Sequence, residues 1–308
     1  MATGYTDFAG YTECVEMVNR DVRVVLGPHY GGRVLAYAWH GENALALDPD
    51  EDGVTYTPGK ENPIGPSGGR FDIGPEMIIP PHPQLWLGAW EIAITGPWSA
   101  QMTSVKDEAT GTQLVRDFHL DPQSSCLTSV QTIRNVSDHE TQWCHWSRTF
   151  GRGHGICVVP LTESSRFPKR YVMYGPGAVM NFAPEDQAVV VRDDYLLVLD
   201  TPQQPKLGLD SYAGWFGYLM PHDVMLVKRF PTYPGRVYNE MAALTISLWY
   251  YQDMVCELEP IGPRQVLAPG ESAAFTESWY LTPYAFPAKR ADVDPVKVAA
   301  AAKALWAG

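Results

Sequence analysis

Two acidic residues late in the chain are the side chains whose type and spacing first suggest chemistry. Glu257 and Glu259 lie two residues apart in an expected strand over residues 254–259, and alternate residues of a strand point to one face. Neighbouring carboxylates on a partly desolvated face raise the pKa of at least one of them, towards a working general base. Cys256 and Leu258 would then face the core. A solvated acidic strand face is the alternative.

A histidine in the middle of the chain is the expected partner of this base. His145 lies between Cys144 and Trp146. An imidazole titrates near neutral pH and can both donate and accept a proton, so we predict His145 as the acid. A packed strand residue is the alternative interpretation.

A proline- and glycine-rich stretch over residues 56–83 carries further chargeable groups. It contains Arg70, Asp72, Glu76 and His82, and it runs directly into Trp86. A loop of this length inside a compact domain is usually functional or disordered. We therefore predict that it forms one wall of a binding cleft, with packing of a sheet edge as the alternative.

The elements that would position these residues are mostly strands. Runs rich in β-branched and aromatic residues recur between Gly and Pro punctuation along the whole chain, as in residues 22–26, 33–39, 126–134, 244–250 and 273–280. Strands do not alternate with long helices, which disfavours a parallel α/β sheet. The sequence predicts an all-β fold, a large antiparallel β-sandwich in one domain of residues 1–308. One C-terminal helix is expected at about residues 294–306, with Asp294 as its N-cap.

Composition narrows the class of protein further. The chain has 308 residues and a net charge of −12, which argues against nucleic acid as a partner because phosphate contacts need clustered Lys and Arg. No apolar run reaches the roughly 18 residues of a membrane span. The five cysteines are scattered, as expected for free thiols in a reducing compartment, and the start of the chain lacks the features of a secretory signal. We therefore expect a cytoplasmic protein that does not contact a membrane.

Three stretches resemble segments of the galactose mutarotase-like (aldose 1-epimerase) superfamily. They are residues 132–150 with Asn135-Val136-Ser137-Asp138, residues 206–215, and residues 254–272 with Leu267-Ala268-Pro269-Gly270-Glu271. Within that superfamily the chain looks most similar to a DUF4380-like branch, on the strength of Gly69-Arg70-Phe71, Lys206-Leu207-Gly208 and Glu277-Ser278-Trp279-Tyr280-Leu281. The resemblance covers about residues 20–285 and implies a β-supersandwich with an open sugar-binding cleft.

The resemblance also implies roles for individual residues. In this superfamily the base is a Glu on a late strand and the acid is a central His, which would correspond to Glu257 or Glu259 and to His145. Counting without gaps from Asn135 instead puts Arg148 at the position of that His. Asp210 resembles an Asp that binds ring hydroxyls, and Arg70 would hold sugar oxygens. Flat faces for a pyranose would come from three tryptophans, Trp86, Trp146 and Trp215.

The function implied is acid/base interconversion at the anomeric centre of a sugar, as in an aldose 1-epimerase, without a cofactor. A polysaccharide lyase or glycoside hydrolase on the same scaffold is the first alternative, and a non-catalytic sugar-binding module is the second. The expected partner is a mono- or oligosaccharide, and the protein would be a monomer or a homodimer. Residues 48–53 match the first half of a calcium loop, but Gly59 takes the place of the bidentate Glu, so no metal site is predicted.

Overall fold

A computed structural model describes residues 3–63, 65, 67–176 and 179–307 of the chain. Its strands form two large antiparallel sheets, which confirms the predicted all-β architecture. Within the described ranges no helix has both the length and the apolar character that a membrane crossing requires.

The first sheet has 13 strands among the described residues. Eleven form a continuous order, and β5 and β22 pair at its side with β4 and β11. In sheet order the strands are β1 (Thr3–Phe8), β2 (Tyr11–Val18), β3 (Val22–Gly27), β4 (Arg33–Trp39), β6 (Gly69–Gly74), β11 (Thr141–Arg152), β21 (Val255–Pro260), β20 (Ile246–Tyr251), β17 (Lys206–Leu209), β13 (Val172–Tyr174) and β14 (Met180–Asn181), with β5 (Glu42–Asn43) and β22 (Gln265–Leu267).

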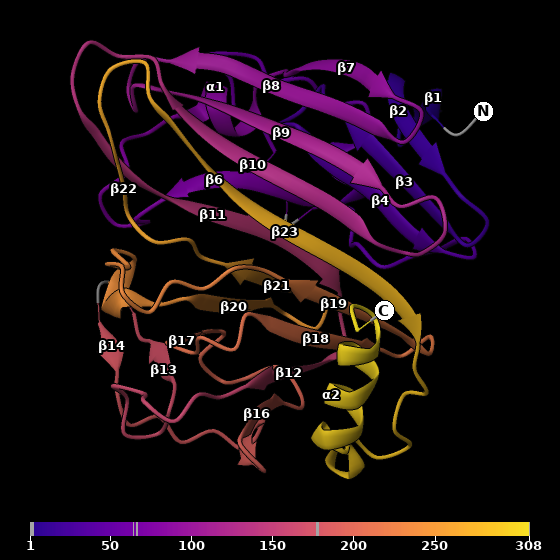
Figure 1. The fold of residues 1–308 in the computed structure, drawn as a ribbon, viewed down its shortest axis with the longest axis vertical. Coiled ribbons are helices and arrows are strands. Elements are labelled where there is room, and N and C mark those ends of the chain that lie inside the picture. Colours follow the sequence, from indigo (N-terminus) through magenta and orange to yellow (C-terminus); the bar gives the residue numbers. More distant parts are fainter. Residues whose placement is uncertain (1–2, 64, 66, 177–178, 308) are drawn as a thin grey trace.

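The second sheet has 10 strands in the described part of the chain. In order they are β15 (Val189–Arg192), β16 (Tyr195–Val198), β12 (Ile156–Pro160), β18 (Trp215–Met220), β19 (Val224–Arg229), β23 (Ser272–Pro283), β10 (Leu127–Asn135), β9 (Thr112–Leu120), β8 (Ser99–Asp107) and β7 (Glu91–Gly96). Strand β23 runs diagonally across the molecule (Figure 1) and pairs with β10 through its first part and with β19 through its last part.

The helices are short. At the C-terminal end, α2 (Pro295–Ala304) begins at Asp294, whose side chain accepts hydrogen bonds from two backbone amides of the first turn, as predicted. Its buried face, Val298, Ala299 and Ala302, packs on the outer side of the second sheet. The sequence did not predict α1 (Pro83–Leu87), which has proline at its start and ends at Gly88. Three single-turn 3₁₀ helices are η1 (Pro49–Glu51), η2 (Met241–Ala243) and η3 (Arg290–Asp292).

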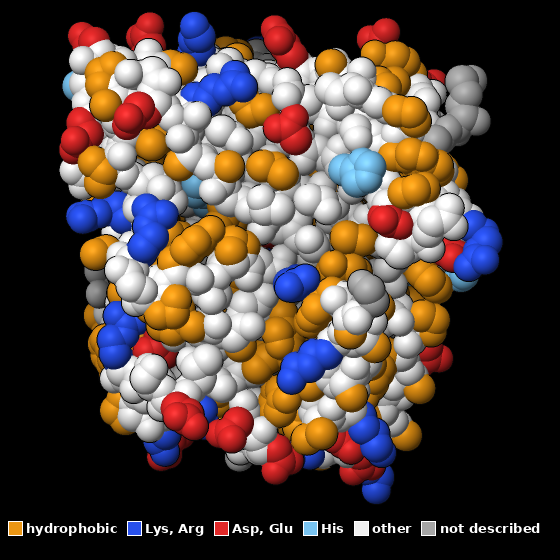
Figure 2. Space-filling view, in the orientation of Figure 1, with side chains coloured by type: hydrophobic (Ala, Val, Ile, Leu, Met, Phe, Trp, Pro, Cys, Tyr) orange, Lys and Arg blue, Asp and Glu red, His pale blue; other side chains and the backbone are white. Residues whose placement is uncertain are grey.

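The main core fills the space between the sheets with apolar side chains from both inner faces, among them Phe71, Leu248, Leu258, Phe118 and Phe275. The five cysteines are free, and all but Cys126 are buried. On the face seen in Figure 2, hydrophobic side chains gather over the lower half around α2, whereas acidic side chains are most frequent along the upper and lower margins.

A fully buried ion pair lies on the inner face of the second sheet, and its lysine reaches the first sheet. Lys228 Nζ on β19 lies 2.9 Å from Glu277 Oε2 on β23, and both side chains are 0% exposed. Lys228 also donates to Ser147, to Thr149 and to the carbonyl of Leu258, all on the first sheet. The ammonium group therefore connects the second sheet to β11 and to β21, the strand that carries Glu257 and Glu259.

We expect Glu277→Ala to lower the free energy of unfolding by about 3–5 kcal/mol, because it leaves Lys228 charged and unpaired in the core. Urea denaturation measures this loss. The double variant Lys228→Met/Glu277→Leu is the control, since replacing both ions with apolar groups of similar volume costs much less. A double variant as unstable as Glu277→Ala would contradict this account.

Candidate functional site

A cavity of about 430 Å³ opens on the outer face of the first sheet, where the proline-rich stretch lies over β6 and β11. Its volume falls within the roughly 300–1,000 Å³ of ligand sites. It is lined by Asp72, Glu76, Ile79, Pro80, Pro81, His82, Pro83, Trp86, Leu87, Trp146 and Arg148. The part of the stretch that follows Gly74 therefore forms a wall of a cavity, and we call this cavity the Trp86–Trp146 pocket.

Strand alternation decides which side chains reach this face. On β11, Trp146 lies opposite Asp72 of β6, and Arg148 lies opposite Arg70. The intervening residues of a strand point to the other face. The pocket therefore receives Trp146 and Arg148 of β11, whereas His145 between Cys144 and Trp146 points to the core.

Arg148 is the central side chain of the pocket. Its guanidinium carbon lies 4.8 Å from the ring centroids of both Trp86 and Trp146, so two indoles flank a cation. Its Nε donates to Glu257 Oε1 at 2.7 Å, and Nη2 approaches Glu257 Oε2 at 3.4 Å. Burial alone would lower the pKa of Arg148, but the charges of Glu257 and Glu259 outweigh it and raise that pKa above its usual range. Arg148 is thus a fixed cation, and the hydrogen bonds that it forms with the described side chains use Nε and Nη2.

The carboxylate pair lies on one face of β21, as the alternation of the sequence indicates, with Cys256 and Leu258 buried on the other. Neither Glu257 nor Glu259 lines the pocket, because Arg148 covers them. Glu259 Oε1 lies 3.3 Å from Arg148 Nε, whose hydrogen bond goes to Glu257. Both oxygens of Glu259 therefore lack a hydrogen-bond partner among the described residues. Burial, followed by the charge of Glu257, raises the pKa of Glu259 to about 8.

A second charged pair, Asp72 and His82, forms one side of the pocket. His82 Nε2 lies 3.0 Å from Asp72 Oδ1, and Nδ1 lies 2.8 Å from the carbonyl oxygen of Pro80. Because both neighbours are acceptors, both ring nitrogens must carry hydrogen, so the ring is an imidazolium. Burial opposes this charge, but the hydrogen bond to Asp72 and the charge of Asp72 raise the pKa of His82 to about 9. His82 therefore ties the proline-rich stretch to β6.

Glu76 belongs to a third pair. Its Oε2 accepts a hydrogen bond from Lys206 Nζ at 2.5 Å. The ammonium also lies 5.0 Å from the ring centroid of Trp146 and 4.9 Å from that of Tyr174. Burial would lower the pKa of Lys206, but the charges of Glu259 and Glu76 raise it. The sequence indicated Lys206 only as part of the Lys206-Leu207-Gly208 motif. In the β17–β20 register Lys206 lies opposite Trp249, so both side chains lie on the same face of the first sheet.

Arg70 lies behind the pocket instead of inside it. Its side chain is 0% exposed, Nη1 donates to the backbone carbonyl of Trp86, and Nη2 reaches the buried carboxylate of Glu51. Glu51 also pairs with Arg33. Arg70 therefore supports α1 and the Trp86 ring, and the predicted direct contact with a sugar oxygen does not fit this position.

His145 is not near the carboxylates of the site. Its ring is 0% exposed and is stacked between Phe71 and Phe275 in the core, with centroid distances of 5.8 Å and 5.7 Å. Nε2 donates to the carbonyl of Ala273, and burial lowers the pKa of the ring to about 4. The prediction of His145 as the acid is therefore corrected, because residue 145 belongs to the core-facing set of β11.

Two further predicted contacts also lie elsewhere. Asp210 is buried and accepts hydrogen bonds from Ser165 Oγ and from the backbone and side chain of Arg166, so it fixes a loop. Trp215 is on the second sheet and packs against Trp306, just beyond α2, at a centroid distance of 6.2 Å. The structure places neither of them at the pocket.

From the sequence, Asp72 was predicted only as one of the chargeable groups of the cleft wall, and it received no individual role. An alternation signal was present: residues 70, 72 and 74 share one face of β6. The stretch was predicted as a wall, but the sequence did not indicate that Ile79, Pro80 and Pro81 in particular would line the pocket. An irregular segment has no periodicity from which the direction of its side chains could be predicted.

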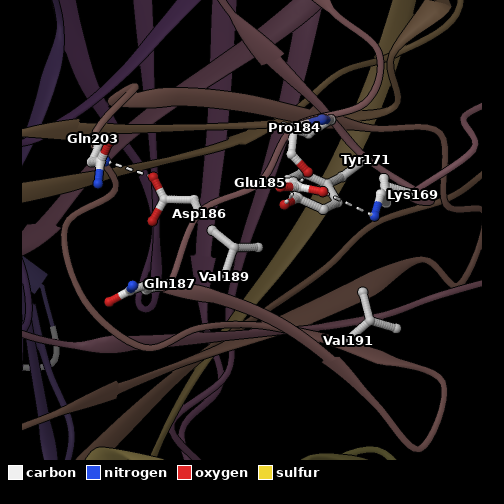
Figure 3. Close-up of a pocket in the computed structure, with 9 residues that line it drawn as sticks. All are labelled: Lys169, Tyr171, Pro184, Glu185, Asp186, Gln187, Val189, Val191 and Gln203. Atoms are coloured by element: carbon white, nitrogen blue, oxygen red, sulfur yellow. Dashed lines mark hydrogen bonds and ion pairs between the residues drawn. The ribbon is translucent and has the colours of Figure 1, made fainter.

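A cavity of about 550 Å³ opens beside β13 and β15 (Figure 3). Its charged residues bond with their neighbours: Asp186 accepts from the backbone of Gln203 at 2.8 Å, and Lys169 lies 3.9 Å from Glu185. It contains none of the predicted site residues. Within the described chain, no three His, Cys, Asp or Glu side chains converge as metal ligands. The Trp86–Trp146 pocket is therefore the better candidate site.

Glu259→Gln should change how stability depends on pH. The native state keeps a proton on Glu259 up to about pH 8, whereas the unfolded chain releases it near 4.5. The free energy of unfolding of the unmodified protein therefore falls as pH rises through this window. The glutamine variant lacks this titration, so its stability relative to the parent should rise with pH, by at most about 1.4 kcal/mol per pH unit. Urea titrations between pH 5 and 8 test this, and a constant difference would contradict it.

His82 should be doubly protonated at neutral pH, because it faces two acceptors. Long-range ¹H–¹⁵N NMR spectra at pH 7 should show both ring nitrogens in the imidazolium state. In Asp72→Asn the pKa of His82 should fall, since the carboxylate that raises it is gone. A His82 ring that is neutral at pH 7 in the unmodified protein would disprove this assignment.

Comparison with known proteins supports the fold. No family model matches the chain, so the narrower DUF4380-like resemblance stays a prediction, and no curated protein matches it either. Among solved structures, the chain is similar to Slr1438 from Synechocystis sp. PCC 6803, with a TM-score of 0.60, 14% identity, and coverage of 90% of this chain and 99% of the other.

Two other solved structures resemble the chain to the same degree. One is a putative aldose 1-epimerase from Escherichia coli K12, with a TM-score of 0.58, 10% identity, and 91% and 99% coverage. The other is a galactose mutarotase-like protein from Lactobacillus casei ATCC 334, with a TM-score of 0.59, 10% identity, and 87% and 100% coverage. The chain therefore has the galactose mutarotase-like fold.

Proposed function

We propose that the protein binds a carbohydrate in the Trp86–Trp146 pocket and interconverts its anomers by proton transfer. The observation that carries the proposal is the Arg148 guanidinium, held by Glu257 and flanked by two indoles in a cavity that also contains ionisable side chains. Indole faces suit the C–H faces of a pyranose, and charged groups suit its hydroxyls. The mutarotase-like fold supports the same substrate class, although fold alone does not fix function.

The proton-transfer groups must be able to touch the sugar. Glu257 and Glu259 lie behind Arg148, so we assign them the role of positioning the guanidinium. Asp72 lines the pocket, and its hydrogen bonds from His82 and from the Ile73 amide both go to Oδ1. We assign Asp72 Oδ2 as the base that removes the anomeric proton, and Arg148 as the group that stabilises the negative charge that develops.

Ring opening also requires a proton for the ring oxygen. Glu76 is the other carboxyl group that lines the pocket, and it is hydrogen-bonded to Lys206. We assign the Glu76–Lys206 pair as the proton source and Asp72 as the proton acceptor, with the roles reversed when the ring closes on its other face. This scheme keeps the acid/base chemistry expected from the sequence but replaces the residues that perform it.

Non-catalytic sugar binding is the second candidate, and two observations favour it. The expected acid His145 lies in the core, and Arg148 covers the expected base. A pocket with these features can recognise hydroxyl groups without transferring a proton.

We expect the protein to accelerate the α-to-β interconversion of at least one free aldose, measured by proton NMR across a panel that includes glucose, galactose and mannose. Asp72→Asn should lower kcat by about 10²–10⁴-fold, the usual contribution of a general base. Asp138→Asn, a change of the same type at a fully exposed turn residue, is the matched control and should keep the parental rate. Sugars that bind without any acceleration would support the second candidate, and a panel with neither binding nor turnover would refute both.

A further inference from the structure

A second cavity meets the Trp86–Trp146 pocket at Trp86 and Arg148. It measures about 500 Å³, and both residues line it as they line the first cavity. The indole of Trp86 and the guanidinium of Arg148 therefore form a shared boundary, and a ligand that touches them from one side can extend to the other.

The far side of this boundary carries an aromatic surface. Trp249 and Tyr251 lie two residues apart on β20, so they share a face, and their ring centroids are 5.4 Å apart at an interplanar angle of 34°. Both line the second cavity. Tyr251 is 38% exposed, although aromatic rings are usually covered when they have only a packing role.

Polar groups are present beside this aromatic surface. Asp48 and Asp50 line the same cavity, near the start of η1. Asp48 accepts a hydrogen bond from the Asp50 backbone through one carboxylate oxygen, and the Asp50 side chain is exposed. Carboxylates accept hydrogen bonds from adjacent hydroxyl groups. The second cavity therefore repeats the chemistry of the first, with flat apolar faces next to charged hydrogen-bonding groups.

We propose that the second cavity is a subsite for a second sugar ring, so that the preferred ligand is a disaccharide or longer glycan with its reducing-end ring in the Trp86–Trp146 pocket. The inference rests on the proposed function, because it extends the same site. The next ring packs on Trp249 and Tyr251, and Arg148 contacts both rings across the shared boundary. A site built for one free monosaccharide does not need this second aromatic surface.

Calorimetry with matched sugars tests the proposal. The probes are glucose, galactose and mannose on one side, and maltose, cellobiose, lactose and mannobiose on the other. We expect at least one disaccharide to bind about tenfold more tightly than its reducing-end monosaccharide. Tyr251→Ala should reduce the affinity for that disaccharide by about three- to tenfold, the range given by loss of one aromatic contact, and should leave monosaccharide affinity unchanged.

Two more variants separate the subsites. Trp249→Ala should act like Tyr251→Ala, whereas Trp146→Ala, in the first pocket, should weaken mono- and disaccharides alike. If disaccharides gain nothing over monosaccharides, or if the gain survives Tyr251→Ala and Trp249→Ala, the second cavity is not a subsite while the proposed function stands. If no sugar of either series binds, the proposed function fails and the subsite fails with it.

Discussion

The contact between the Arg148 guanidinium and the buried carboxylates of β21 is the interaction on which the candidate site depends. It places a cation between two indoles, and it leaves Glu259 buried without a hydrogen bond to any residue that the structure describes. Burying the Glu257 carboxylate beside Glu259 without a counter-charge would be strongly unfavourable. The fold therefore requires a cation at this position of β11, and the same cation gives the pocket its hydrogen-bond donor.

The support for this contact comes from both sides of the sheet. On the outer side, Arg70 holds the backbone of Trp86, so that the indole lies over Arg148. On the inner side, Lys228 bonds to the backbone of Leu258, the residue between the two glutamates. Each support is itself a buried cation with its own partners. Buried cations thus support the Arg148–Glu257 contact from both sides of the sheet, each through a hydrogen bond to a backbone carbonyl.

The parts of the molecule that follow from strand alternation could be predicted from the sequence. Glu257 and Glu259 share a face because their spacing requires it, and the sandwich itself follows from repeated short β-rich segments. The position of His145 could not be predicted in this way. Alternation shows that the side chains of His145 and Trp146 point to opposite sides of the sheet, but it does not show which side carries the cavity. Trp86 reaches the pocket only because of the five-residue helix α1, which is too short to leave a periodic signal. Asp210 was misplaced because its assignment depended on similarity to a short motif. Trp215 was misplaced because a flat aromatic ring suits core packing as well as a sugar face.

Strand β23 has a consequence for the order in which the chain can fold. It is the partner of both β10 and β19, and so it lies between two parts of the second sheet that are each made earlier in the sequence. On the ribosome, β10 and β19 emerge well before β23, and each exposes an unpaired edge during that time. Such edges are templates for pairing with other chains. Nascent copies of this protein should therefore need chaperone protection until about residue 283 has left the exit tunnel.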